Sequence, residues 1–272
     1  MNTLKLNNGI AMPQLGFGVW QVPDAQATPA VAAALKAGYR SIDTAAIYGN
    51  ERGVGEALAT ADRDELFVTT KLWNADQGYD STLRAFDESL KKLQLDVLDL
   101  YLIHWPTPAR DLYADTWKAF VELQKEGRVR AIGVSNFQPA HLRRLIDETG
   151  VVPAVNQIEL HPYLQQAELR AFHAQHGIQT EAWSPLGQGG ELLSDPVIAE
   201  IAEKHGRSAA QVVLRWHLQI GNVVIPKSVT PARIVENISV FDFELSDEEI
   251  AAVSTLDRAG RIGPNPDAFN EA

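Results

Sequence analysis

Short apolar segments rich in β-branched residues alternate along this chain with longer segments of helical period. Most of the short segments are apolar on both faces, which is typical of a parallel sheet covered on both sides. Strands are predicted over residues 15–20, 40–45, 66–72, 98–105, 129–136, 154–160, 178–183 and 223–227. Helices are predicted over residues 27–37, 53–59, 81–93, 113–125, 139–148, 166–176, 196–205 and 231–240.

The order of these elements predicts a closed α/β barrel. Strand and helix alternate eight times without a linker or a break in composition, which favours a (β/α)8 TIM barrel, one domain over residues 1–272. An Asn8-Gly9 turn between two apolar runs predicts an N-terminal β-hairpin that plugs the barrel bottom. Ser246 and Glu249 form a capping-box pattern in an extra C-terminal helix over residues 245–256.

Composition narrows the classes of function. The chain has no cysteine, which excludes disulfides and thiolate metal sites and suits a reducing compartment. Its net charge of −11 opposes binding to nucleic acid. No signal peptide is recognised and no apolar run is long enough to span a bilayer. We expect a cytoplasmic protein without a nucleic-acid or membrane partner, and a monomer, because nothing in the sequence indicates an obligate interface.

Common nucleotide and metal motifs do not occur in the sequence. The Rossmann GxGxxG, Walker A and HExxH patterns are all missing. His173 and His176 share one face of a predicted helix, but that helix has no nearby third ligand. We interpret the pair as a solvated helix face and expect no metal. A nucleotide would have to bind by a route other than a Rossmann fold.

Ionisable residues gather at the predicted C-terminal ends of the strands, where barrel enzymes carry their chemistry. Asp43 and Tyr48 follow the second strand, Lys71 ends the third and His104 ends the fourth. Each alone has a structural explanation, such as a loop carboxylate, amphipathic packing, a buried ion pair or a core histidine. On three successive strands, the four together favour a catalytic site.

These four residue types suit the donation of a proton to a carbonyl group. A tyrosine hydroxyl is ordinarily too weak an acid for this at neutral pH. The ammonium of a nearby Lys71 would stabilise the tyrosinate and lower the pKa of Tyr48. Asp43 would hold the lysine charged and in place. A neutral His104 could orient the carbonyl through a hydrogen bond.

The motifs GYRSIDTAAIYGNE, TKLW, DLYLIHWP, GVSNF, VNQIELHP, WSPLG and IPKSVTPARIVEN follow one another over essentially the whole chain. They resemble the aldo-keto reductase family, and within it the prokaryotic 2,5-diketo-D-gluconate reductases. The resemblance implies that NADPH, or NADP+ after reaction, binds an extended site on the barrel. It implies hydride transfer to a small aldehyde or ketone, with Tyr48 as proton donor and 2,5-diketo-D-gluconate as a candidate substrate.

The resemblance also implies the residues that would bind the cofactor. Trp183 would stack on the nicotinamide ring. The carboxamide would be held by Ser135, Asn136 and Gln157. The pyrophosphate would lie along Ser184, Leu186, Gly187 and Gln188. The 2′-phosphate would contact Lys227, Ser228 and Arg233, and the adenine would contact Glu236 and Asn237.

The substrate pocket implied by the resemblance has aromatic walls. It would be lined by Trp20, Ile47, Tyr48, Trp73, His104 and Trp105. The loop that follows His104 is short, and the tail over residues 258–272 is rich in proline and glycine. We expect a mobile tail and a pocket open to water, which favours small, hydrophilic carbonyl compounds.

Two alternative functions remain open from the sequence. Lys71 could form a Schiff base with a carbonyl substrate, as in a lyase, although a lysine held charged between Asp43 and Tyr48 is a poor nucleophile. The same fold and cofactor site could also serve an NADPH-binding or sensing subunit without physiological turnover.

Overall fold

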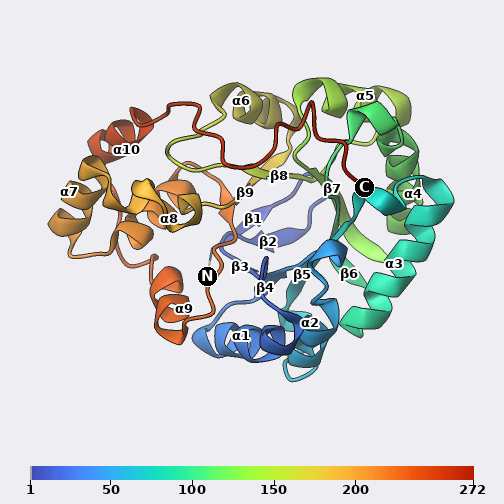
Figure 1. The fold of residues 1–272 in the computed structure, drawn as a ribbon, viewed down its shortest axis with the longest axis horizontal. Helices are drawn as coiled ribbons and strands as arrows, with labels where there is room; N and C mark the ends of the chain where they lie inside the picture. The colour runs from blue at the N-terminus through green and yellow to red at the C-terminus, as the bar shows by residue number, and fades with distance from the viewer. Residues whose placement is uncertain (1) are drawn as a thin grey trace.

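The computed structural model describes residues 2–272, and within them eight parallel strands form one sheet. The strands follow chain order as β3 (Phe17–Gly18), β4 (Ser41–Asp43), β5 (Phe67–Leu72), β6 (Leu98–Ile103), β7 (Val129–Ser135), β8 (Val155–Glu159), β9 (Gln179–Trp183) and β10 (Val223–Val224). The two edges meet where Leu15 pairs in parallel with Val224. The sheet therefore closes on itself, and the predicted barrel is confirmed (Figure 1).

Helices surround the barrel (Figure 1). They are α1 (Asp24–Ala37), α2 (Glu51–Leu58), α3 (Tyr79–Leu93), α4 (Tyr113–Lys125), α5 (Pro139–Thr149), α6 (Ala167–His176), α7 (Pro196–His205), α8 (Ala209–Gln219), α9 (Pro231–Ile238) and α10 (Asp247–Ser254). Short 3-10 helices lie in the loops at Ala46–Tyr48, Arg63–Glu65, Asn74–Asp76, Pro108–Arg110, Gly187–Gly189 and Glu191–Ser194. Over residues 2–272, no helix has the length and apolar character needed to cross a membrane.

Helix α8 is missing from the helices that the sequence pattern predicts. Its residues 211–218 are all buried, although Gln211, Arg215 and Gln219 recur every four residues, as on one face of a helix. Its start does carry a local signal, because Ser208 and Gln211 form a capping box. The capping box predicted for α10, between Ser246 and Glu249, is present.

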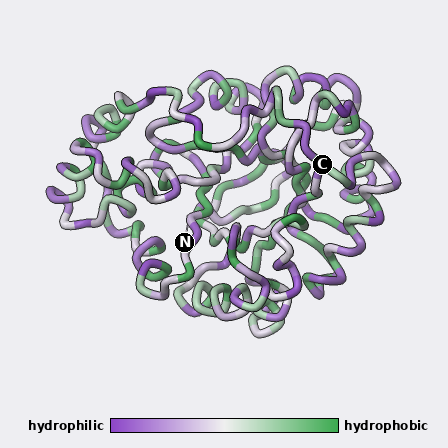
Figure 2. The backbone as a smooth tube through the Cα atoms, in the orientation of Figure 1, coloured by the Kyte–Doolittle hydropathy of each residue, from purple (hydrophilic) through white to green (hydrophobic). Residues whose placement is uncertain are grey.

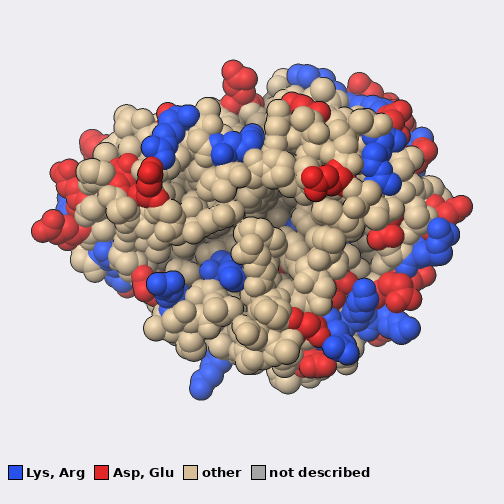
Figure 3. Space-filling view, in the orientation of Figure 1, with Lys and Arg blue, Asp and Glu red and all other residues tan. Residues whose placement is uncertain are grey.

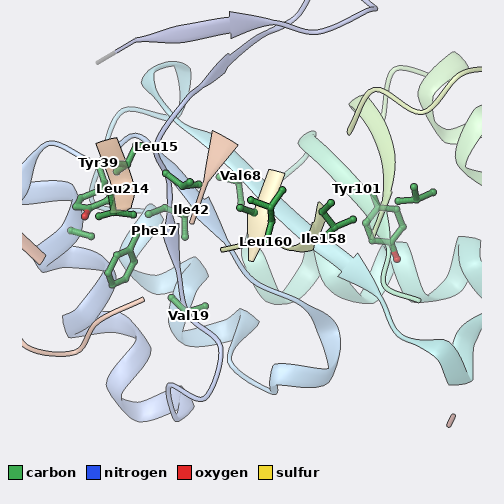
Figure 4. Packing of buried hydrophobic residues seen from close by; sticks show 14 of the residues in the cluster. Leu15, Phe17, Val19, Tyr39, Ile42, Val68, Tyr101, Ile158, Leu160 and Leu214 are labelled. Atoms are coloured by element: carbon green, nitrogen blue, oxygen red, sulfur yellow. The ribbon is translucent and has the colours of Figure 1, made fainter. Parts of the chain in front are cut away.

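The core lies mainly between the sheet and the helices. Leu15, Ile42 and Val68 are fully buried and belong to one hydrophobic cluster with Leu214 of α8 (Figure 4). Figure 2 shows the same division, with hydrophobic strands at the centre and hydrophilic segments on the outer faces of the helices. Burial of this apolar surface is the main force that holds the barrel together.

The N-terminal hairpin closes one end of the barrel, as predicted. Strand β1 (Thr3–Lys5) pairs antiparallel with β2 (Ala11–Pro13). Leu6 and Met12 pack against Phe67, the first residue of β5, and against neighbouring strand starts. Because the hairpin covers the N-terminal ends of the strands, their C-terminal ends form the accessible rim.

The interpretation of the two helical histidines as a solvated face is wrong for His173. This side chain is buried, with ring nitrogens 2.9 Å from the Asn156 amide nitrogen and 2.9 Å from the Thr180 hydroxyl. Burial lowers the pKa of His173 to about 3. It is a neutral structural histidine between α6 and the sheet. In the described part of the chain, no three His, Cys, Asp or Glu residues are grouped so that they could hold a metal ion.

Candidate active site

Four ionisable side chains meet at the C-terminal rim of three neighbouring strands. Asp43 ends β4, Lys71 lies one residue before the end of β5, and His104 directly follows β6. Tyr48 ends the short 3-10 helix that follows β4. The Lys71 ammonium donates to Asp43 Oδ1 at 2.6 Å and to the Tyr48 hydroxyl at 3.5 Å. The structure therefore brings together the four residues that the sequence places at strand ends.

Lys71 is fully buried, and its ammonium has three oxygen partners. The third is the carbonyl oxygen of Thr44, at 2.9 Å. Burial alone would lower the pKa of Lys71, but the charges of Asp43 and Tyr48 outweigh burial and raise the pKa above its usual value. The lysine is therefore held as a cation in the protein interior, which requires a counter-charge and satisfied donors.

The pKa of Tyr48 is the balance of two opposing effects. Burial raises it, Lys71 lowers it, and the result lies above the usual value for tyrosine. The expected direction of the lysine's effect is confirmed. The net shift of the pKa is nevertheless upward, because removing the hydroxyl from water penalises tyrosinate more than the ammonium stabilises it. Lys71 thus offsets part of the penalty that burial places on proton donation.

His104 is a neutral imidazole beside this ion pair. Burial, and then the positive charge of Lys71, lower the pKa of His104 well below its usual value. The centroid of its ring lies 5.7 Å from that of Tyr48 and 5.4 Å from that of Trp73, both edge to face. A neutral imidazole has one N–H donor, so His104 can offer one hydrogen bond to a polar group at the rim.

The residues predicted to hold a carboxamide form a connected set on β7, β8 and β9. The Ser135 hydroxyl donates to the carbonyl oxygen of Gln157 at 2.8 Å. The Asn136 amide donates to the carbonyl oxygen of His104 at 3.0 Å and accepts from the Trp183 indole N–H at 2.8 Å. Asn136 has a positive φ of 64°. Such a backbone conformation is uncommon for a residue other than glycine and is often found at functional sites.

The other predicted cofactor residues lie on two segments that follow β9 and β10. Ser184, Leu186, Gly187 and Gln188 follow β9, and Lys227, Ser228, Arg233, Glu236 and Asn237 lie between β10 and the end of α9. Lys227 and Arg233 are exposed, while Ser228 and Asn237 are buried. Figure 3 shows basic side chains near α9 on this face of the molecule.

The predicted pocket residues differ in their exposure. Trp20 and Ile47 are exposed, with 43% and 48% of their surface accessible. Trp73 is half-buried against His104. Trp105 is buried, and its ring centroid lies 4.6 Å from that of Phe269 in the C-terminal tail. The face of the molecule in Figure 3 is hollowed near its centre.

The C-terminal tail crosses the rim and packs against the site (Figure 1). It is irregular, as expected, but it is anchored. The Glu159 carboxylate accepts hydrogen bonds from the backbone N–H groups of Ile262 and Gly263 at 2.6 and 2.8 Å. Gly263 approaches Trp183 so closely that a Cβ atom there would lie 2.5 Å from the indole ring. The tail therefore lies against Trp183 and Trp105 at the rim, whereas the sequence predicted a mobile tail.

Sequence reasoning did not single out two buried glutamates at this rim. Glu159 ends β8, and Glu181 lies in the middle of β9. Each lies within a predicted strand, and a buried charge within a strand requires a polar partner. That signal is present in the segments NQIEL and QTEAW. Hydrogen bonds from His161 and the tail backbone lower the pKa of Glu159 against the opposing effect of burial.

The fold and the rim define a barrel protein whose ionisable cluster surrounds a tyrosine. The model of the Aldo/keto reductase family matches residues 12–258, and the chain belongs to this family. The resemblance that the sequence motifs indicate is thereby confirmed.

Relatives cover nearly the whole chain. Methylglyoxal reductase DkgA of Salmonella typhimurium is 58% identical over 269 residues, which are 98% of this chain and 97% of that protein. An aldo-keto reductase of Mycolicibacterium smegmatis is 60% identical over 269 residues, or 98% of each. Among solved structures, an aspartate-to-alanine mutant of Gox0644 in complex with NADPH has a TM-score of 0.96 at 55% identity, with 98% of each chain covered. An aldo/keto reductase from Brucella melitensis has a TM-score of 0.91 at 60% identity, over 94% of this chain and 99% of that one.

Proposed function

We propose that this protein uses NADPH to reduce small aldehydes and ketones to alcohols, with Tyr48 as the proton donor. The observation that carries the proposal is the buried Lys71 ammonium, 3.5 Å from the Tyr48 hydroxyl at the rim. Bound NADPH would supply the hydride. As the carbonyl oxygen gains negative charge, Tyr48 gives it a proton, and Lys71 stabilises the tyrosinate that remains.

Asp43 and His104 support this proton transfer in different ways. Asp43 keeps Lys71 charged and directs its ammonium toward the tyrosine, through the 2.6 Å contact. His104 is neutral, so it orients the substrate carbonyl by a hydrogen bond instead of competing with Tyr48 as an acid. Because Lys71 stays charged, it is a poor nucleophile, which disfavours a Schiff-base lyase.

The residues present fit NADPH. Ser135, Asn136 and Gln157 offer the mixed donors and acceptors that a carboxamide needs, and the half-buried Trp183 offers a ring for stacking. Lys227 and Arg233 form no salt bridge within residues 2–272, although the chain is rich in carboxylates. Lys227 in the loop before α9 and Arg233 in its first turn suit a 2′-phosphate, and Ser228 adds a hydroxyl beside Lys227.

A small dicarbonyl compound is the substrate class that we propose. Trp20 and Trp73 provide apolar walls. Phe269 of the tail packs against Trp105 at the rim and limits the space there. The name of the DkgA relatives supports methylglyoxal, and the motif resemblance supports 2,5-diketo-D-gluconate, which would give 2-keto-L-gulonate. We also propose that the protein works as a monomer in the cytoplasm, where the absence of cysteine suits the reducing conditions.

The substitution Tyr48→Phe tests the function directly. NADPH oxidation is followed by absorbance with methylglyoxal, 2,5-diketo-D-gluconate and simple aromatic aldehydes. We expect kcat to fall by roughly 10²–10⁴-fold, because a positioned general acid contributes about that much. NADPH should still quench the tryptophan fluorescence of the variant.

Tyr101→Phe is the matched control. Tyr101 is buried in β6, and its hydroxyl has no hydrogen-bond partner in the part of the chain that the structure describes. This control should retain activity. Unchanged turnover in Tyr48→Phe would remove Tyr48 from its role. A wild-type protein that binds NADPH but reduces no carbonyl in the panel would favour a sensing subunit.

A further inference from the structure

Glu181 is a buried carboxyl group that the proposed proton transfer does not use. It lies on β9 with 1% of its surface exposed and pairs in register with Gln157 of β8. Its Oε2 accepts a hydrogen bond from the Gln157 amide nitrogen at 2.9 Å. Its Oε1 has no hydrogen-bond partner among residues 2–272. A buried carboxyl group with one partner is costly, so its retention here requires a reason.

The amide of Gln157 is held between two carboxyl groups. Its nitrogen donates to Asp43 Oδ2 at 2.8 Å as well as to Glu181. An amide nitrogen carries two hydrogens, and both are used. The reversed amide would place its oxygen against an ionised Asp43, which is repulsive. Among residues 2–272 the amide oxygen has no hydrogen-bond partner, so it can accept a hydrogen bond from a ligand.

The same contacts connect Glu181 to the proton donor. Gln157 joins it to Asp43, Asp43 binds Lys71, and Lys71 contacts Tyr48. Burial, and then the charge of Asp43, raise the pKa of Glu181 to about 8, although Lys71 and the Gln157 hydrogen bond oppose this. At neutral pH, Glu181 is therefore an uncharged acid. Its ionisation would add a negative charge that raises the pKa of Tyr48.

We propose that Glu181 is a positioning residue of this site. Together with Asp43 it holds the Gln157 amide with the nitrogen turned inward, so that the amide oxygen is free for the carboxamide N–H of the nicotinamide. Proton donation by Tyr48 is most effective when Glu181 is uncharged. This inference rests on the proposed binding of NADPH. Glu181 itself contacts neither the cofactor nor the substrate in this account, because it acts through Gln157 and through its charge.

A binding experiment tests the positioning role without turnover. Glu181→Leu removes the acceptor, while Glu181→Gln keeps an oxygen that accepts from Gln157 and imitates the uncharged acid. Tryptophan quenching gives the Kd for NADPH, and calorimetry gives the Kd for 2′,5′-ADP, which lacks the nicotinamide. We expect Glu181→Leu to weaken NADPH binding by about tenfold and to leave 2′,5′-ADP unchanged, while Glu181→Gln stays within about twofold of wild type.

A pH profile tests the role of the uncharged state. As the pH rises through about 8, Glu181 loses its proton, and Tyr48 becomes a weaker donor. The wild-type kcat should therefore fall above that pH, and Glu181→Gln should lack this fall, because it cannot ionise. Asp43 and Lys71, which act on the pKa of Glu181, and Tyr48, whose pKa Glu181 raises, are the same in both proteins.

The outcomes separate this inference from the proposed function. Equal NADPH affinity in Glu181→Leu and wild type, or a parallel loss of 2′,5′-ADP binding, would overturn the positioning role. Identical pH profiles for wild type and Glu181→Gln would overturn the role of the uncharged state. A wild-type protein that does not bind NADPH at all would instead overturn the proposed function.

Discussion

Replacing Lys71 with methionine should destabilise the protein strongly. Methionine keeps much of the apolar stem but removes the ammonium. Asp43 is 2% exposed, and its Oδ1 would lose the lysine partner at 2.6 Å. Only the Gln157 hydrogen bond to Oδ2, at 2.8 Å, would remain from this cluster. A buried charge left without its counter-charge costs about 3–5 kcal/mol, so the free energy of unfolding should fall by that amount.

A double-mutant cycle separates this charge effect from lost packing. In the double variant Asp43→Asn/Lys71→Met, neither partner carries a charge, so no carboxylate is left unpaired. We expect the double variant to be more stable than Lys71→Met by about 2 kcal/mol, because residues in direct contact are coupled by that order of energy. Lys71→Met would then be less stable than Asp43→Asn/Lys71→Met, although the double variant carries one more substitution.

Urea unfolding at pH 7, followed by tryptophan fluorescence, measures these free energies. Lys36→Met is the matched control, because Lys36 is an exposed lysine on α1. It should change the free energy of unfolding by less than about 0.5 kcal/mol. The reasoning fails if Lys71→Met matches this control, or if the effects of the two substitutions in the cycle simply add.

Two further predictions concern the outer parts of the site. Arg233→Ala should raise the KM for NADPH by about tenfold or more and leave the KM for NADH unchanged, since only NADPH carries the 2′-phosphate. Equal changes in the two KM values, or the same change in the exposed control Arg84→Ala, would contradict a contact between Arg233 and the 2′-phosphate. Glu159→Gln should loosen the tail, because an amide is a weaker acceptor for the Ile262 and Gly263 N–H groups. Limited proteolysis should then cut the tail faster than in wild type, and an unchanged rate would exclude the anchor.

Local patterns in the sequence were sufficient to predict the positions of most strands and helices of the barrel. Helices α4 and α7 occupy the predicted residues 113–125 and 196–205, because their apolar positions recur on one face and Gly206 ends α7. Strands β3 and β10 are shorter than predicted, with two residues each. The barrel closes where the backbone of β3 lies close to the segment that follows β10, since a Cβ on Gly18 would lie 2.9 Å from the carbonyl oxygen of Ile225.

The features that the sequence did not predict depend on contacts between distant residues. Glu159 and Gly263 are 104 positions apart, so no local period indicates that the tail is anchored to β8. The pKa of Tyr48 depends on how deeply the folded barrel buries its hydroxyl, which the spacing of charged residues does not reveal. The strand ends could be predicted because every parallel strand of a barrel points to the same rim.

The buried ion pair is better explained by chemistry than by stability. Replacing a buried pair with apolar residues of similar size often leaves a protein equally stable or more stable. Selection for stability alone would therefore not retain Lys71 and Asp43. With His104 neutral and Glu181 uncharged at neutral pH, this pair supplies the two opposite charges of the cluster. A cation fixed beside Tyr48 is what proton donation needs, so a variant that lacks the pair should fold and yet fail to reduce carbonyl compounds.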